Sequence, residues 1–162
     1  MELNKVTLAA HIRASTVPAV VAALAIRNDV ALADLYNEPS AFIVWRTRRS
    51  KAELRADAVV GAGEMDNLEA GKRDALFWLL SDDINPSDAA VRSAFVDLTA
   101  NRSGGYVATA LRASLSAGAK RAATLCESVF ATGTGTTAVP GQLTYEGLLT
   151  HTDISAALNA PV

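Results

Sequence analysis

Apolar and small residues recur every three or four positions through residues 104–133, the longest stretch of the chain that is compatible with one helix. Residues at this spacing share one face of a helix. The stripe comprises Val107, Leu111, Leu115, Gly118, Ala122, Leu125 and Val129. Two adjacent glycines precede it, and a Thr-Gly-Thr-Gly segment follows it. The pattern predicts one long helix near 105–131, around which the other helices pack. A helix of roughly 25 residues would span about 38 Å at about 1.5 Å per residue.

Three short helices are expected in the first 37 residues, separated by residues that commonly cap helices. The first covers residues 6–14. The second follows Ser15 or Thr16 and has Pro18 in its first turn, where the missing N–H costs little. Its expected buried stripe comprises Val17, Val20, Val21 and Leu24. The third covers residues 30–36, with Asp29 as its cap.

The middle of the chain begins with a pattern typical of β structure. Residues 41–46 (AFIVWR) are aromatic or β-branched and predict a short strand or a packed extended segment. Ser50 followed by Glu53 is a capping-box pattern and predicts a helix over 51–60. A second such pair, Asp66 and Glu69, predicts a helix over 67–80. Asn85, followed by a proline, predicts the cap of a helix that ends near residue 98.

The helix predicted over 67–80 has a broad apolar surface. Its stripe comprises Leu68, Ala75, Leu76 and Leu79. Phe77, Trp78 and Leu80 widen that stripe beyond one face. The breadth predicts a helix that is buried on more than one side or that lies at a subunit contact.

The pattern changes again after residue 133. Residues 134–141 are small and polar and contain glycine and proline, and residues 142–150 alternate enough for a strand or an extended arm. Asp153 is expected to cap a short helix over 154–159. The fold class is therefore mainly α, a compact helical bundle around a long helix near 105–131, with a short extended or β segment near 41–46 and an extended C-terminal arm near 133–150. We expect one structural domain, with a helical part over 1–132 and the arm and terminal helix over 133–162.

Composition narrows the class of protein. Half of the 162 residues are apolar but only 6% are aromatic, which favours close-packed helices. A net charge of −2 gives no general attraction for nucleic acid. Cys126 is the single cysteine, so one chain holds neither a disulfide framework nor a cysteine metal site, and we expect it in the core.

The early part of the chain shows no membrane or export pattern. Its most apolar run, residues 17–26, is about half of the ~20 residues that a membrane span needs. Charged residues within 1–28 argue against a secretion signal. We therefore expect a soluble protein of a reducing compartment, without a membrane partner.

The residues with potential chemistry are few and scattered. His11 and His151 lie near opposite ends of the sequence, and neither is predicted beside an activated nucleophile. Asp82, Asp83 and Asp88 lack the spacing of a calcium loop and are expected at helix boundaries. The Gly-Thr-Gly at 133–135 follows a helix, whereas a phosphate loop precedes one. We expect no catalytic residues, no cofactor and no metal.

Basic residues concentrate within residues 46–55, here called the basic segment. They are Arg46, Arg48, Arg49, Lys51 and Arg55. Three interpretations stay open: contact with nucleic-acid phosphates, contact with an acidic partner surface, and a solvated helix start. Trp45 beside the segment favours a partner contact, because Trp and Arg are frequent interface anchors. The alternative places Trp45 in the core and Arg46 against a local carboxylate.

Four segments resemble a family of small proteins of tailed bacteriophages. They are residues 41–47 (AFIVWRT), 119–124 (AKRAAT), 126–136 (CESVFATGTGT) and 143–159 (LTYEGLLTHTDISAALN). The matches follow the family's order and spacing, and the turn at 130–135 and residues 145–147 are the most specific. The chain departs from the family after Arg46, where Arg48 and Arg49 make it more basic.

The resemblance implies a non-enzymatic structural protein of the phage particle, assembled in the host cytoplasm. The expected form is a ring at the head–tail junction, a connector or neck subunit that contacts its own copies, the portal, neck or tail proteins and incidentally the packaged DNA. Each subunit of a ring uses two different patches, here the basic segment and the 133–150 arm. The expected interface residues are Trp45, Arg46, Arg48, Arg49, Arg55, Thr134, Leu143, Tyr145 and Leu148. The alternatives are a tail or capsid accessory protein and a small DNA-associated packaging or regulatory factor.

Overall fold

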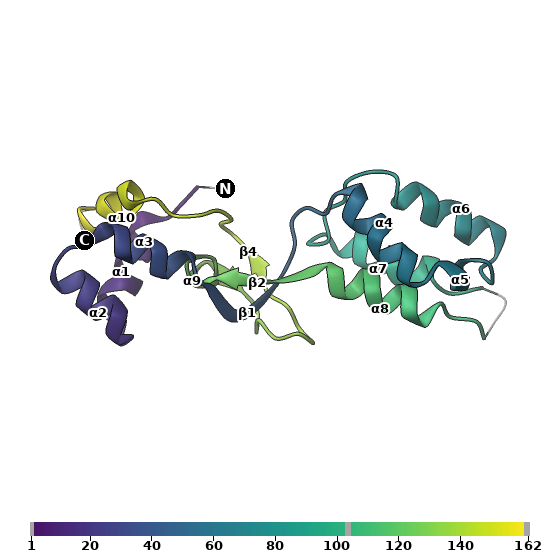
Figure 1. Ribbon diagram of the computed structural model, residues 1–162, viewed down its shortest axis with the longest axis horizontal. Helices are drawn as coiled ribbons and strands as arrows, with labels where there is room; N and C mark the ends of the chain where they lie inside the picture. The colour runs from purple at the N-terminus through teal and green to yellow at the C-terminus, as the bar shows by residue number, and fades with distance from the viewer. Residues whose placement is uncertain (1, 103–104, 161–162) are drawn as a thin grey trace. The chain divides into compact units, whose positions relative to one another are not determined.

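The computed structural model describes residues 2–102 and 105–160, and the fold is mainly α with short strands, as predicted (Figure 1). The first half contains α1 (Lys5–Ala14), α2 (Pro18–Ala25), α3 (Asp29–Asn37), β1 (Pro39–Trp45), α4 (Lys51–Val60), α5 (Ala62–Met65) and α6 (Ala70–Leu79). The second half contains α7 (Ala89–Leu98), α8 (Thr109–Gly118), β2 (Lys120–Thr124), α9 (Leu125–Val129), β3 (Ala131–Thr132), β4 (Gln142–Leu143) and α10 (His151–Leu158).

The backbone contacts divide the chain into two compact units. Unit 1 combines residues 1–44 with residues 122–162, and unit 2 is the intervening stretch, residues 45–121. This division differs from the expected one at residue 132, because both ends of the chain build the same unit. The chain passes between the units once in β1 and once in β2, and these two strands pair in one sheet.

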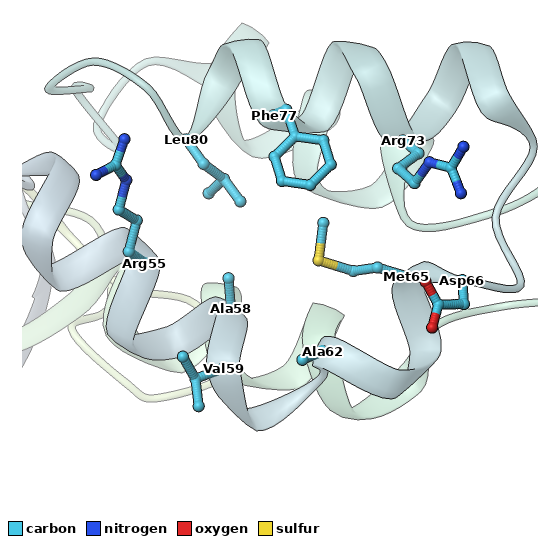
Figure 2. A pocket seen from close by; sticks show the side chains of 9 residues that line it. All are labelled: Arg55, Ala58, Val59, Ala62, Met65, Asp66, Arg73, Phe77 and Leu80. Atoms are coloured by element: carbon cyan, nitrogen blue, oxygen red, sulfur yellow. The ribbon is translucent and has the colours of Figure 1, made fainter.

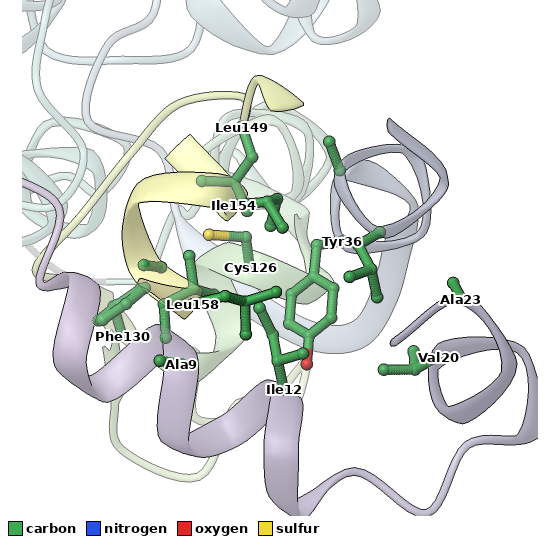
Figure 3. Packing of buried hydrophobic residues seen from close by; sticks show 14 residues of the cluster. Ala9, Ile12, Val20, Ala23, Tyr36, Cys126, Phe130, Leu149, Ile154 and Leu158 are labelled. Atoms are coloured by element: carbon green, nitrogen blue, oxygen red, sulfur yellow. The ribbon is translucent and has the colours of Figure 1, made fainter. Parts of the chain in front are cut away.

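The core of unit 1 brings together helices from the two ends of the chain. α1 and α3 both pack against α10. Fully buried side chains from all three meet there, including Ile12, Tyr36 and Ile154, and Cys126 of α9 lies among them (Figure 3). The Tyr36 hydroxyl is 2.8 Å from Nδ1 of His11, so the one polar atom of this ring is satisfied. The expectation that Cys126 is a core residue is confirmed.

Two caps in unit 1 lie one and three residues before the predicted positions, and α2 begins after Val17, which has no side-chain cap bond, and not after a Ser15 or Thr16 cap. Asn28, rather than Asp29, accepts the hydrogen bond at the start of α3. Thr150 caps α10, and Asp153 completes a capping box as its third residue. Asp153 therefore stabilises the helix from inside its first turn, where a carboxylate also meets the positive helix end.

The segment after residue 133 is not a free arm, because it docks within unit 1. β3 and β4 form a short antiparallel ladder that pairs Ala131 with Leu143. Ile43 of β1 donates its N–H to Gly135 and accepts the N–H of Gly141, at 2.7 and 2.8 Å. The side chain of Asn37 bonds both backbone groups of residue 149. Backbone groups of the segment after residue 133 are thus hydrogen-bonded to other parts of unit 1.

Unit 2 is a cluster of helices around α8. Leu54, Leu76 and Phe95 bring the inner faces of α4, α6 and α7 to Leu111 and Leu115 of α8. Gly61, at the end of α4, lies so close to α8 that a Cβ there would sit 2.5–2.9 Å from atoms of Leu111. The glycine therefore permits the close approach of these two helices.

Of the three helix caps predicted in unit 2, at Ser50, Asp66 and Asn85, one is confirmed. The capping box of Ser50 and Glu53 is confirmed at the start of α4. Asp66 does not cap α6, which begins at residue 70, and it instead ends α5. Asn85 does not cap α7 either; its side chain accepts the N–H and hydroxyl of Ser87, and Asp88 is the cap.

The prediction of one long helix over 105–131 is wrong. α8 ends at Gly118, residues 120–124 form β2, and α9 begins at residue 125; Ser103 and Gly104 lie outside the described residues. Pairing with β1 and burial of Ala123 beside Val44 override the helical preference of this alanine-rich stretch. Thr124 and Glu127 then form a capping box that starts a new helix.

Among residues 2–102 and 105–160, no single helix is long and apolar enough to cross a membrane. Only α1 and α2 taken together, with a bend of 108° between them, reach the necessary length and composition.

Candidate interaction surface

An open apolar groove of about 510 Å³ lies in unit 2, between α6 on one side and α4 and α5 on the other (Figure 2). Its lining comprises Arg55, Ala58, Val59, Ala62, Met65, Asp66, Arg73, Phe77 and Leu80. This volume falls within the range of sites that hold small ligands or anchoring side chains of a partner. We call it the α4–α6 groove.

Helical spacing explains why the two walls of the groove are apolar. On α6, Arg73, Phe77 and Leu80 follow one another at intervals of four and three residues and so share one face. On α4, Arg55, Ala58 and Val59 share a face in the same way. The buried leucines that pack on α8, Leu54 and Leu76, lie on adjoining sides of these helices, and Ala58 and Leu80 of the lining also contact that core. The apolar surface of each helix is therefore wider than the part that the core covers.

The groove continues into an exposed aromatic rim. Phe77 and Trp78 are both exposed, and together they line a second, shallower hollow beside it. Val59 and Val60 are exposed on the α4 side. Large exposed apolar side chains that adjoin one another mark contact sites more often than isolated ones do. The broad apolar stripe predicted for residues 67–80 favoured burial on more than one side or a subunit contact. In the single chain, the side of α6 that carries Phe77 and Trp78 faces solvent.

The ends of the groove carry charge. Figure 2 shows Arg55 at one end of the lining and Arg73 at the other, with Asp66 beside Arg73. Within the described ranges, the side chains of Arg55 and Arg73 make no hydrogen bond or ion pair. The groove thus offers two unpaired guanidinium groups around an apolar floor.

The rest of the basic segment is neutralised by carboxylates of unit 2. Arg46 pairs with Glu53, whose pKa this arginine and the capping hydroxyl of Ser50 lower to about 2. Arg48 pairs with Asp83 and holds the pKa of that carboxyl below its usual value. These ion pairs weaken the interpretation of the segment as a nucleic-acid surface, because phosphates would have to compete with bound carboxylates.

Arg49 is not an interface residue in this fold, contrary to the prediction. Its side chain is buried and pairs with Asp57 of α4, beside Gly118 at the end of α8. A Cβ added to Gly118 would collide with this ion pair. The nitrogens Nε and Nη1 of Arg49 have no hydrogen-bond partner. The ion pair is therefore part of the α4–α8 contact.

Trp45 lies against the core, as the alternative to a partner contact predicted. It packs against the core of unit 2, with the guanidinium carbon of Arg92 4.6 Å and the amino group of Lys120 5.3 Å from its ring centre. Two cations over one indole ring form a favourable cation–π arrangement. Arg46 beside it bonds a local carboxylate, as that alternative expected.

The predicted interface residues of unit 1 are divided between surface and core. Thr134 is exposed, and its hydroxyl donates to the carbonyl of Val139 at 2.9 Å. Leu148 is exposed as well. Tyr145 is half-buried against Phe130, and burial raises its pKa. Leu143 is buried in a small cluster with Val44, so it is not accessible to a partner.

A second apolar surface, which we call the α2 face, lies on unit 1. Between residues 17 and 26 the chain has no polar side chain. Val20 and Ala23 face the core, but Val17, Val21 and Ile26 are exposed. The expected burial of Val17 and Val21 is therefore wrong, because α2 packs through the other side of the helix. The uninterrupted apolar run was the sequence signal for this surface.

The remaining candidates for chemistry are engaged locally or exposed. Burial raises the pKa of the Cys126 thiol to about 12. Asp83 accepts from Arg48 and from the backbone of residue 51. His151 is an exposed first residue of α10. Over residues 2–102 and 105–160, no group of three or more His, Cys, Asp or Glu is arranged to hold a metal ion.

Comparison with known proteins yields no relative. The chain matches no protein-family model, and neither a curated protein nor a solved structure is significantly similar to it.

Proposed function

We propose that this protein is a non-enzymatic structural subunit of a tailed-bacteriophage particle, which assembles with other copies into a ring at the head–tail junction. The observation that carries the proposal is the α4–α6 groove with its exposed aromatic rim. A subunit that is built to be covered by a neighbour leaves such a surface open when it is alone.

The size of the exposed surface supports the part of the proposal that several contacts act together in the assembly. Val59, Phe77 and Trp78 are 73%, 58% and 78% exposed. Covering them would contribute roughly 3–6 kcal/mol, taking about 1.5–3 kcal/mol for each large apolar side chain and scaling by the exposed fraction. Association costs about 4–15 kcal/mol. One such contact is marginal by itself, whereas a closed ring joins many contacts in one assembly.

The phage setting of the proposal rests on the resemblance of residues 41–47, 119–124, 126–136 and 143–159 to small tailed-phage proteins. Its proposed partners are further copies of the chain and the portal, neck or tail proteins. The alternative, a tail or capsid accessory protein, has the same surface requirements and differs in its location and copy number.

Mass spectrometry of purified, nuclease-treated particles tests the proposal directly. A ring at the junction predicts a small fixed copy number per particle, equal to the number of subunits that close the ring. Hundreds of copies would instead support a capsid or tail-tube location. Absence from the particle would refute a structural role.

The DNA-associated alternative has its own test. Retention on DNA at low salt, lost steeply as salt rises, would support it. The carboxylate partners of Arg46 and Arg48 lead us to expect no such retention.

A further inference from the structure

We infer that the α4–α6 groove of one copy receives the α2 face of a second copy. The contact is head-to-tail, because it joins two different patches of the same chain. This inference deepens the proposed assembly role and rests on it, since it names the partner of the groove.

The two surfaces match in length. The α6 wall runs from Arg73 to Leu80, about 10 Å at about 1.5 Å per residue. α2 has eight residues and is about 12 Å long. A two-turn helix therefore fills the groove along its axis, in the helix-in-groove mode by which many proteins bind an apolar helix.

The two surfaces also match in chemistry. The groove is lined mainly by aliphatic, aromatic and thioether side chains. Val17 and Val21 of the α2 face lie four residues apart on one side of the helix, and the exposed Ile26 directly follows the helix. No residue from 17 to 26 has a polar side chain that would lose its water on docking. A helix without polar side chains avoids the cost of burying an unpaired polar group. Met65 in the groove floor can adapt its shape to branched side chains.

The charges beside each surface are complementary, because the groove lining carries two arginines and one carboxylate, Asp66, whereas Arg27 after α2 is paired with Asp29 at 3.8 Å and leaves Asp34 as the unpaired charge there among the described residues. The groove ends in Arg55 and Arg73, which lack partners among the described residues. α3, which packs against α2, carries the exposed Asp34, which has no ion pair or hydrogen bond within the described ranges. Asp34 follows the exposed Val30 by four residues and so shares its face of α3. A carboxylate beside the docked helix would thus meet one of the arginines.

A head-to-tail contact has a geometric consequence. After the first contact, each end of the pair still offers one unused patch, so assembly continues until it closes as a ring or extends as a filament. A symmetric contact of groove against groove would instead stop at a dimer. The two arrangements are separated by mixing variants.

The experiment uses two variants of the full chain, Phe77→Asp in the groove and Val21→Asp on the α2 face. Each places a carboxylate at a solvent-exposed position, so circular dichroism is expected to match that of the wild type. Native mass spectrometry and sedimentation over a range of concentrations give the assembly state. The wild type is expected to form assemblies larger than a dimer, and each variant alone is expected to be monomeric.

Mixing the two variants supplies the decisive result. Phe77→Asp keeps its α2 face and Val21→Asp keeps its groove, so an equimolar mixture is expected to form a heterodimer that does not grow. Val96→Asp on α7 and Val139→Asp in the loop after β3 are the matched controls; both positions are exposed and lie outside the two surfaces. Both controls are expected to assemble like the wild type.

Three results would overturn the inference. One is a wild type that stays monomeric at every concentration. Another is a Val21→Asp variant that still assembles while Phe77→Asp does not, which would indicate a groove-to-groove dimer or a different partner. The third is a mixture that forms no heterodimer. Failure of the proposed function is distinguishable from these, because it appears as absence of the protein from phage particles.

Discussion

The buried ion pair of Arg49 and Asp57 predicts an unequal response to removal of its two members. The side chain of Arg49 is 3% exposed, whereas that of Asp57 is 24% exposed. Removing Asp57 leaves a guanidinium group buried without an anion, while removing Arg49 leaves a carboxylate that water reaches. We therefore compare Asp57→Ala with Arg49→Met, which preserves most of the length of the arginine side chain.

The structure sets the expected sizes of the two effects. Breaking a buried pair costs about 3–5 kcal/mol when an uncompensated charge stays buried, and this is the expectation for Asp57→Ala. Arg49→Met also removes Nε and Nη1, which are buried without partners. An unpaired buried donor costs about 1–3 kcal/mol, so its removal offsets part of the loss. The expected cost of Arg49→Met is below about 2 kcal/mol.

Urea unfolding followed by tryptophan fluorescence measures both values. The two tryptophans of the chain, Trp45 and Trp78, lie in unit 2 with the ion pair, so the signal reports that unit. Equal slopes against urea would show that stability, and not the denatured state, has changed. Arg48→Met removes an exposed ion pair and serves as the control, with an expected change in the free energy of unfolding far smaller than that of Asp57→Ala. A cost for Arg49→Met equal to or above that of Asp57→Ala would refute the reasoning.

Three further predictions concern packing, pH and thiol reactivity. Gly61→Ala is expected to destabilise unit 2 by about 1–3 kcal/mol in urea, while the control Gly71→Ala, whose added atom meets nothing within 4 Å, is expected to stabilise α6 by about 0.5–1 kcal/mol. The pKa of Glu53 is lowered from 4.5 to about 2, so its stabilising effect is present above pH 4.5 and is lost as pH falls toward 2. Glu53→Gln should flatten that part of the profile of urea midpoint against pH, and an unchanged profile would contradict this. Because burial raises the pKa of Cys126 to about 12, a thiol reagent at mildly alkaline pH should label it only as fast as the protein unfolds; rapid labelling of native protein would disprove its burial.

Sequence patterns predicted a helix start correctly where the residue that stabilises it is near in the chain. The capping box at Ser50 depends on a residue three positions away and was predicted correctly. At residue 69 the start of α6 is stabilised instead by Asn101, whose Oδ1 accepts the N–H of Glu69 at 2.8 Å. That partner is 32 residues further along the chain, so no local pattern at Asp66 indicated where the helix begins.

The long-helix prediction failed for a related reason. Periodicity over 107–129 is compatible with a helix, but it contains no information about β1, the strand with which β2 pairs. The Thr124 and Glu127 pair was a local sign of a new helix start that the alanine-rich stretch obscured. A capping box inside a periodic stretch is better taken as a boundary.

The candidate surface was predicted in part. The width of the apolar stripe at Phe77 and Trp78 predicted either burial on more than one side or a subunit contact, and both residues lie exposed at the groove. The concentration of basic residues at 46–55 was a weaker guide to the surface, because the sequence does not show which of these arginines have carboxylate partners. Arg49 pairs with Asp57, eight positions away, and Arg48 pairs with Asp83, 35 positions away. Only the folded chain brings these pairs together.

The interrupted layout of unit 1 has a consequence for how the protein is made. Unit 2 is complete in the chain at residue 121, before residues 122–162 of unit 1 have been translated. At about 5–20 residues per second, these take about 2–8 s to synthesise. During that time the inner faces of α1 and α3, with Leu8, Ile12 and Leu32, lack the α9 and α10 side chains that cover them. The early helices therefore depend on late sequence, and a chain truncated after residue 121 would leave the inner faces of α1 and α3 as an open apolar surface that attracts chaperones.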